Sequence, residues 1–252
     1  MSRVLVLANQ KGGVAKTTST LNLGVALHEL GHGVLIVDMD PQGNLTMSQG
    51  LDPDEVNPSM NEVLTQGISI EDVIYKRELD IAVASIDLAG AEQVLMSVIG
   101  RERAMSRALM QVKHLYDFVL IDTPPSLGLL TINALTAADS VIVPVQCEYL
   151  SMRGLAQLQG TLELVRENLN PDVKLGGILP TMFDSRTRHG MEAVELLRES
   201  FGELVFDTVI RKTIKFAEAP VEGISVLKYA PSSDAAESYR SLAREVLNGK
   251  KV

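Results

Sequence analysis

The chain has 252 residues, and 46% of them are hydrophobic, which is enough for one large α/β core. A formal net charge of −9 at pH 7 argues against wholesale coating of nucleic acid but leaves room for a local basic patch. The one cysteine, Cys147, excludes a disulfide framework within the chain and an iron–sulfur cluster held by several thiolates. No signal-peptide pattern or membrane-spanning apolar run is present, so we expect a soluble, cytoplasmic protein.

Short β-branched runs alternate with helical stretches, which predicts an α/β fold with a doubly wound, mostly parallel sheet covered by helices on both faces. The expected strands are residues 4–8, 34–38, 81–84, 118–122, 140–145, 175–181, 204–210 and 225–227. The expected helices include residues 17–30, 155–169, 190–201 and 234–248. No repeat or long linker divides the chain, so residues 1–252 are expected to form a single domain, with the irregular segment 51–80 decorating the sheet.

The segment between the first expected strand and the first expected helix has the character of a phosphate-binding loop. Residues 9–18 read Asn-Gln-Lys-Gly-Gly-Val-Ala-Lys-Thr-Thr. Glycines let the backbone approach a phosphate, and the start of a helix offers unpaired N–H groups and a positive dipole. We therefore expect Lys16 to contact the β- and γ-phosphates and the Thr17 hydroxyl to bind Mg²⁺.

This loop departs from the usual pattern G-x-x-x-x-G-K-[ST], because Gln10 and Ala15 stand where that pattern has glycines. What remains, Lys11-Gly-Gly-x-x-Lys16-Thr-Thr, resembles the deviant Walker A motif of the ParA/MinD family of ATPases, and within it the ParA/Soj chromosome-partitioning branch. The resemblance implies that Lys11 reaches across a homodimer to the partner's nucleotide. Ala15 departs from the family's more usual Gly, and its methyl group is tolerated only if the local φ is negative. The loop residues expected to bind ATP or ADP are Lys11, Gly12, Gly13, Val14, Ala15, Lys16, Thr17 and Thr18.

Two later strands end in carboxylates, at the edge where ligands bind in such sheets. Asp122 follows the run Phe-Val-Leu-Ile, which is the Walker B arrangement, and is expected to hold the Mg²⁺ shell. The segments beginning at Asp38 and Asp122 resemble the D-x-D-P-Q-G-N and D-x-P-P motifs of ParA proteins. This resemblance implies that Asp40 positions or activates the attacking water, that Asp38 supports the metal site, and that Lys11 acts in trans as an arginine finger does. Taken singly, each acid is also typical of a turn; the three motifs in this order favour ATP hydrolysis.

The same resemblance assigns an adenine site. The loop after residues 175–181 lies beside the adenine in ParA relatives, which makes Thr181 and Met182 candidates for contact with the base. The later segment Glu-Ala-Pro, residues 218–220, matches the family's E-A-P motif and adds Pro220. The alternative for each of these positions is a packing role.

Basic residues gather in the last third of the chain, at Arg186 and Arg188 and then at Arg211, Lys212 and Lys215. This region resembles the DNA-binding surface of chromosomal ParA proteins, where the ATP dimer joins two patches on non-specific double-stranded DNA. It implies a nucleoid-associated protein whose affinity for DNA falls steeply with salt. The alternative is ordinary solvated charges paired with nearby acids. No helix-turn-helix precedes the expected ATPase region, so recognition of a specific operator is not expected.

The resemblance also implies a ParB/Spo0J-type activator that stimulates hydrolysis through a short basic segment. Three alternatives stay open. A MinD-like ATPase would end in a basic amphipathic helix on the membrane, but residues 239–252 hold no Phe or Trp, so no stable membrane insertion is expected. A ParA-like ATPase that positions another cellular cargo shares every motif named above. A metabolic ATP-dependent ligase on the same fold would need a further substrate pocket, for which no motif is found.

Overall fold

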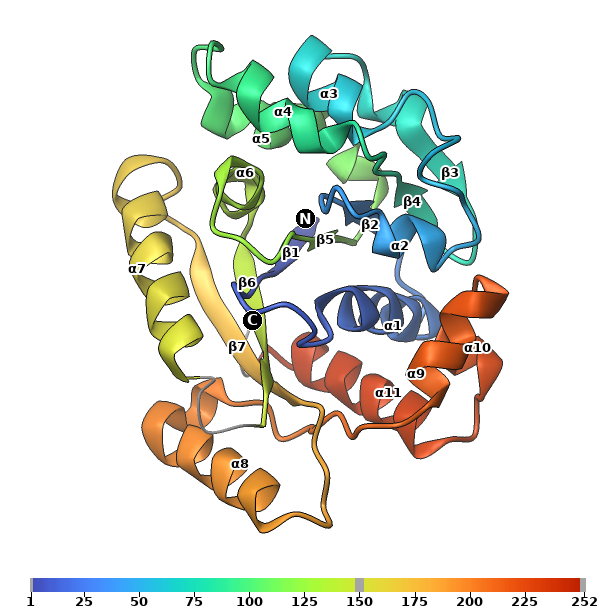
Figure 1. The fold of residues 1–252 in the computed structure, drawn as a ribbon, viewed down its shortest axis with the longest axis vertical. Helices are drawn as coiled ribbons and strands as arrows, with labels where there is room; N and C mark the ends of the chain where they lie inside the picture. The colour runs from blue at the N-terminus through green and yellow to red at the C-terminus, as the bar shows by residue number, and fades with distance from the viewer. Residues whose placement is uncertain (1, 148–151, 250–252) are drawn as a thin grey trace.

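A computed structural model describes residues 2–147 and 152–249, which form one seven-stranded sheet with helices on both faces (Figure 1). The strand order is β3-β4-β2-β5-β1-β6-β7, and every neighbouring pair is parallel except β3 with β4. The doubly wound, mostly parallel sheet expected from the sequence is therefore confirmed. In chain order the strands are β1 (Arg3–Leu7), β2 (Val34–Asp38), β3 (Ile74–Lys76), β4 (Asp80–Ala82), β5 (Phe118–Asp122), β6 (Ser140–Gln146) and β7 (Lys174–Thr181).

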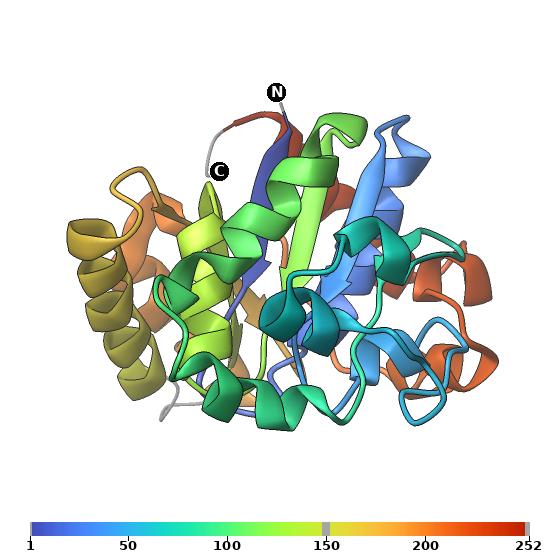
Figure 2. The same cartoon turned by 90° about the horizontal axis from the view of Figure 1, so that it is seen from above.

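The sheet has an apolar core on each face, because side chains alternate between the two faces along a strand. In β1, Val4 and Val6 join one core, while Leu5 and Leu7 join the other. Helices α3 to α7 cover the first core, and α1, α10 and α11 cover the second. Seen from above, α4, α5 and α6 lie in front of the strands and α11 lies behind them (Figure 2).

The α-helices are α1 (Lys16–Glu29), α2 (Asn44–Met47), α3 (Met60–Gln66), α4 (Leu88–Leu95), α5 (Ala104–Val112), α6 (Leu129–Ala137), α7 (Met152–Asn168), α8 (Arg188–Phe201), α9 (Lys215–Glu218), α10 (Val226–Tyr229) and α11 (Asp234–Leu247). Short 3-10 helices span Ile70–Val73, Arg101–Arg103, Lys113–Leu115, Gly202–Leu204 and Ala219–Glu222. None of the helices in the part of the chain that the structure describes is long and apolar enough to cross a membrane.

The expected strand at residues 204–210 is wrong. This segment pairs with β7 only through isolated parallel bridges, such as the one between Ile178 and Val205. In its middle, the backbone N–H groups of Asp207 and Thr208 donate to the carboxylate of Glu245 on α11, at 2.9 and 2.8 Å. A side chain of the neighbouring helix thus takes up donors that a continuous ladder needs.

Two further expectations are corrected. Residues 225–227 begin helix α10 instead of forming a strand, because the Ser225 hydroxyl accepts a hydrogen bond from the Lys228 N–H and caps the helix. Within the segment expected to be irregular, residues 51–80, β3 pairs antiparallel with β4 and extends the edge of the sheet. Three residues of strand are too short to give a clear alternating pattern in the sequence.

Candidate functional site

A cavity of about 600 Å³ opens at the carboxyl ends of β1, β2 and β5. There the loop that begins at residue 9 leads from β1 into α1 (Figure 1). The parallel strands of this sheet all end on the same side, so the three motifs found in the sequence meet there. The expected site residues that line the cavity are Gly12, Gly13, Ala15, Lys16, Thr17, Thr18, Asp40, Met182 and Pro220.

The loop is fixed to the sheet by side chains on both sides. Asn9 donates its amide N–H to the carbonyl of Pro144 (2.7 Å) and accepts a hydrogen bond from the backbone N–H of Lys11 (3.0 Å). On the other side, the hydroxyl of Thr181 donates to the carbonyl of Val14 (3.0 Å), and both of these residues are buried. The loop around the cavity is therefore fastened to β6 and to β7.

Ala15 has a φ of +68°, so the negative φ at which its methyl group is tolerated is not present. This left-handed conformation strains a residue that carries a Cβ atom. Ala15 is also the cap residue of α1, and it makes no side-chain hydrogen bond to the helix. The first N–H groups of α1 consequently face the cavity without a side-chain partner at the cap position, which suits an anion.

One lysine and one carboxylate, Lys16 and Asp40, line the cavity, and two further carboxylates lie fully buried behind it. The hydroxyl of Thr17 donates to Oδ2 of Asp122 (2.6 Å), which lies fully buried at the end of β5. Asp38 is also fully buried and accepts hydrogen bonds from the N–H and the hydroxyl of Thr46, at 2.9 and 2.8 Å. It therefore braces the loop after β2 from behind the cavity. Lys16 is only 6% exposed.

Burial and charge shift the pKa values of these groups. Burial raises the pKa of Asp38 to about 6, against the effect of its hydrogen bonds. Burial and the charge of Asp38 raise the pKa of Asp122 well above its usual range, although Thr17 and Lys16 oppose this. Burial lowers the pKa of Lys16, while Asp122 and Asp40 raise it. A cation bound beside these two carboxyl groups would stabilise their ionised form and offset the cost of burial.

The oxygen donors present fit Mg²⁺. Among the described residues, no group of three His, Cys, Asp or Glu side chains could enclose a metal ion. Mg²⁺ does not require such a cage, because it is commonly held by one or two carboxylates together with water and substrate phosphates. Oδ1 of Asp122 is buried and accepts no hydrogen bond from the described residues. Thr17 and Asp122 would therefore hold the ion, which would neutralise charge on the phosphates, and Asp38 would support them.

Asp40 and Lys11 occupy different positions relative to the cavity. Asp40 lines it, and its Oδ1 accepts a hydrogen bond from the backbone N–H of Gln42 (3.0 Å), which fixes the orientation of the carboxylate. Lys11 is exposed and does not line the cavity. Its Nζ donates to Oε1 of Gln146 at the end of β6 (2.8 Å). Lys16 thus lines the cavity of its own chain, whereas the Nζ of Lys11 is turned to Gln146 outside it.

Of the three residues expected to contact the adenine base, two line the cavity and one does not. Met182, with a φ of +53°, and Pro220 both line the cavity. Thr181 does not line it, because its side chain is fully buried and donates to the carbonyl of Val14. The expected contact between Thr181 and the base is therefore replaced by a supporting role behind the loop.

Comparisons with known proteins agree with this geometry. A family model described as an AAA domain matches residues 2–175. The sporulation initiation inhibitor protein Soj of Bacillus subtilis is 45% identical over 249 residues, covering 98% of each chain. The chromosome partitioning protein ParA of Myxococcus xanthus is 41% identical over 250 residues, covering 98% of this chain and 88% of that one. The chain belongs to the ParA/Soj/MinD family of ATPases.

A solved structure supports the same assignment. The structure named cobyrinic acid a,c-diamide synthase from Mycobacterium smegmatis, with bound ADP and magnesium, is 43% identical and superposes with a TM-score of 0.87, covering 98% of this chain and 95% of that one. As a member of the family the protein is an ATPase. The expected P-loop fold and the expected ligands, ATP or ADP with Mg²⁺, are confirmed at this level.

The five basic residues expected to contact DNA do not all line the same cavity of this ATPase. Arg186 pairs with Asp184 at 2.7 Å on an exposed loop, so its charge is compensated locally. Arg188 begins α8, and its side chain lies outside the part of the structure that is described. The other three expected residues, Arg211, Lys212 and Lys215, line a separate cavity of about 390 Å³ beside the start of α11, together with serines and Asp234.

Sequence reasoning missed several residues of the ATPase site. Gln42, Asn44, Met47 and Ser48 line the nucleotide cavity from the loop after Asp40 and from α2, and Pro125, Ala217 and Val221 line it from two other segments. Spacing could have indicated Gln42 and Asn44, which share a loop with Asp40. Gln146 belongs to no sequence motif. Its contact with Lys11 is visible only in the structure, because β6 ends beside the loop of residues 9–18.

Proposed function

We propose that this ATPase is a partition protein that dimerises around ATP, binds double-stranded DNA without sequence preference as a dimer, and releases DNA after hydrolysis. The observation that carries the proposal is the separation of the two loop lysines. Lys16 is buried beside Asp40 and Asp122 in the cavity, while Lys11 lies outside it with its Nζ on Gln146. A lysine that lies outside the cavity of its own chain does not serve that chain's phosphates, which favours a role on the nucleotide of a second subunit.

The residues around the cavity divide the work of phosphoryl transfer, which depends mainly on positioning and charge neutralisation. The N–H groups at the start of α1 and the ammonium of Lys16 bind the phosphates. Bound Mg²⁺ supplies further neutralisation, held by Thr17 and Asp122. Asp40 orients the attacking water, since its carboxylate is fixed by the Gln42 N–H and faces the cavity. Hydrolysis is slow, because Asp40 is the one candidate base and Lys11 arrives only with the partner subunit.

DNA binding rests on the cavity beside the start of α11, lined by Arg211, Lys212 and Lys215. One subunit offers few phosphate contacts, but a dimer doubles them. For about six contacts the logarithm of the binding constant falls with the logarithm of the salt concentration with a slope of roughly −5. Dimerisation by ATP thus switches DNA affinity. It follows that the protein is associated with the nucleoid in the cytoplasm.

The partner is a ParB/Spo0J-type activator that stimulates hydrolysis and so releases the dimer from DNA. The similarity to the Soj and ParA proteins supports this choice of system. The name of the Mycobacterium smegmatis structure points to a second candidate, a synthase acting on cobyrinic acid. A synthase consumes ATP only with its acid substrate and does not bind DNA. Measuring ATP hydrolysis without that substrate, and measuring DNA binding, therefore distinguishes the two candidates.

Three substitutions test the assigned roles. Lys16→Ala loses nucleotide affinity, Lys11→Ala binds nucleotide but does not dimerise, and Asp40→Ala holds ATP in a dimer that does not turn over. Nucleotide binding by fluorescence, mass by sedimentation and phosphate release are measured for each. Lys174→Ala, an exposed lysine at the start of β7, is the matched control and behaves as the unmodified protein. Hydrolysis at the normal rate by Asp40→Ala contradicts the role given to Asp40.

A further inference from the structure

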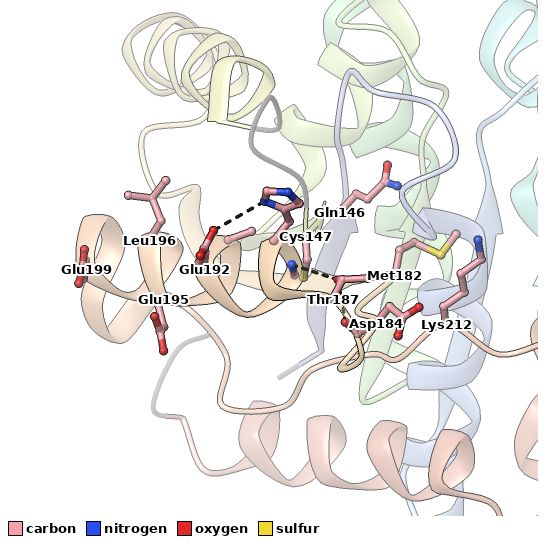
Figure 3. Close-up of a pocket in the computed structure, with 13 residues that line it drawn as sticks. Gln146, Cys147, Met182, Asp184, Thr187, Glu192, Glu195, Leu196, Glu199 and Lys212 are labelled. Atoms are coloured by element: carbon pink, nitrogen blue, oxygen red, sulfur yellow. Dashed lines mark hydrogen bonds and ion pairs between the residues drawn. The ribbon is translucent and has the colours of Figure 1, made fainter.

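A third cavity, larger than the two described above at about 830 Å³, lies beside the nucleotide site. Its walls come from the end of β6, from the loop that follows β7 and from one side of α8 (Figure 3). Thr187 caps α8 by accepting a hydrogen bond from the Gly190 N–H (3.2 Å), so the start of the helix is fixed at the mouth of the cavity. Among its lining residues, Lys212 is assigned above to DNA and Met182 to the base, but the wall provided by α8 has no role in the account above.

The helical wall combines negative charge with an apolar strip. Glu192, Glu195 and Glu199 line the cavity at spacings of three and four residues, and Ala193 and Leu196 line it between them. Glu192 lies 3.7 Å from the ring of His189, while Glu195 and Glu199 form no ion pair with the described residues. At the opposite end Lys212 contributes a positive charge (Figure 3). Carboxylates around an apolar strip complement a segment that carries both Lys or Arg and a leucine-sized side chain.

One residue is shared by the two cavities. Met182 lines both the α8 cavity and the nucleotide cavity, and in Figure 3 it lies at the end away from Glu199. The residue before it, Thr181, holds the nucleotide-binding loop through Val14 and also accepts the backbone N–H of Cys147 (3.1 Å). An occupant of the α8 cavity therefore contacts a wall of the nucleotide cavity.

We propose that the α8 cavity is the docking site for a basic, leucine-bearing segment of the activator, and that its occupancy changes nucleotide affinity through Met182. The inference rests on the proposed function for the identity of the partner. Binding of the segment does not depend on DNA or on hydrolysis. Because coupling between sites is reciprocal, the segment and the nucleotide change each other's affinity by the same factor.

The probe is a short synthetic peptide rich in Lys and Arg, with two leucines one helical turn apart and a fluorescent label. Its affinity for the ADP-bound full-length protein is measured by anisotropy, and ADP affinity is measured with and without the unlabelled peptide. We expect Glu195→Lys/Glu199→Lys to weaken peptide binding at least about tenfold. The matched control, Glu163→Lys/Glu167→Lys, makes the same change in net charge at exposed positions on α7 and keeps normal affinity. Replacing both leucines of the peptide by serine weakens binding to the unmodified protein.

Each outcome decides the proposal. Equal loss of binding in the α7 and α8 variants, or no effect of the leucines, shows general charge attraction and overturns the site. Binding without any change in ADP affinity overturns the link through Met182. If the α8 variant loses ATP-dependent dimerisation but keeps peptide affinity, this face is a contact between two copies and the proposal is wrong. The peptide assay uses the ADP-bound protein and requires neither DNA binding nor ATP hydrolysis. If the proposed function fails on either count, the peptide result therefore still tests the α8 cavity.

Discussion

The hydroxyl of Thr181 donates to the carbonyl of Val14 across 3.0 Å, joining the end of β7 to the loop that surrounds the nucleotide cavity. Both partners are buried, so water does not compete for this bond. The residue after Val14 has a left-handed backbone, and the residue after Thr181 does too. Two strained turns are thus fastened to each other by one hydrogen bond.

Thr181→Val removes the donor and keeps the shape of the side chain. The Val14 carbonyl then loses its buried partner, which costs about 1–3 kcal/mol. We expect nucleotide affinity to fall about tenfold, equivalent to 1.4 kcal/mol, because the loop no longer holds its conformation. Titration with a fluorescent nucleotide measures the change. Thr181→Ser retains the hydroxyl and is expected to bind normally; equal loss in both variants would mean that the methyl group, not the hydrogen bond, matters.

The contrast between Lys16 and Thr181 shows what the sequence could provide. Lys16, Thr17, Asp40 and Asp122 could be predicted because each follows a strand within a short motif, and parallel strands bring such positions together. Thr181 carries a pattern too, but whether its side chain turns to the base or to the loop depends on packing between strands distant in the chain. Local patterns do not contain that information.

Ala15→Gly is expected to stabilise the protein. Ala15 has a φ of +68°, where an L-residue with a Cβ is strained, and glycine adopts this conformation freely. We expect a gain of about 1 kcal/mol in the free energy of unfolding, after the greater entropy of glycine in the unfolded chain is subtracted. Ala89→Gly on α4 is the control and is expected to destabilise. A loss of stability in Ala15→Gly would contradict the strain. Denaturant unfolding measures both.

Gly177→Ala is expected to destabilise the fold by about 1–3 kcal/mol, because an added Cβ would collide with the ring of Phe206. Phe206 is fully buried in the segment expected to be a strand, and its backbone N–H donates to the carbonyl of Ile178 in β7 (2.9 Å) while its ring lies against Gly177. Gly160→Ala on α7, where no atom lies within 4 Å of the added Cβ, is the control and should stabilise slightly. Thermal unfolding distinguishes the two; equal midpoints would refute the close contact.

The same glycine explains why the strand at residues 204–210 was predicted wrongly. Its apolar residues match a strand pattern, but Phe206 fills the space that Gly177 leaves, and Glu245 binds the N–H groups of Asp207 and Thr208. Both causes come from residues far away in the chain. The central strands, in contrast, could be predicted because burial on both faces leaves uninterrupted apolar runs.

Cys147 is expected to react slowly with iodoacetamide. Burial raises the pKa of its thiol to about 12, so at pH 8 the thiolate fraction is roughly a thousandfold lower than for an ordinary thiol of pKa 9. The rate should rise about tenfold per pH unit and not level off between pH 9 and 10. Unfolding in denaturant should restore the ordinary profile. Mass spectrometry follows the alkylation, and a plateau near pH 9 in the native protein would contradict the buried, neutral thiol.

The central claim is that the nucleotide in the cavity decides whether the protein binds DNA. The most direct test is binding to a random-sequence DNA duplex with ATP, with ADP and without nucleotide, at two salt concentrations, with Asp40→Ala beside the unmodified protein to hold the ATP state. We predict tight binding only with ATP, strongest for Asp40→Ala and steeply weakened by salt. Equal binding in all three nucleotide states would contradict the switch. Absence of binding in every state, together with sedimentation on anionic liposomes, would replace the DNA account with a membrane one.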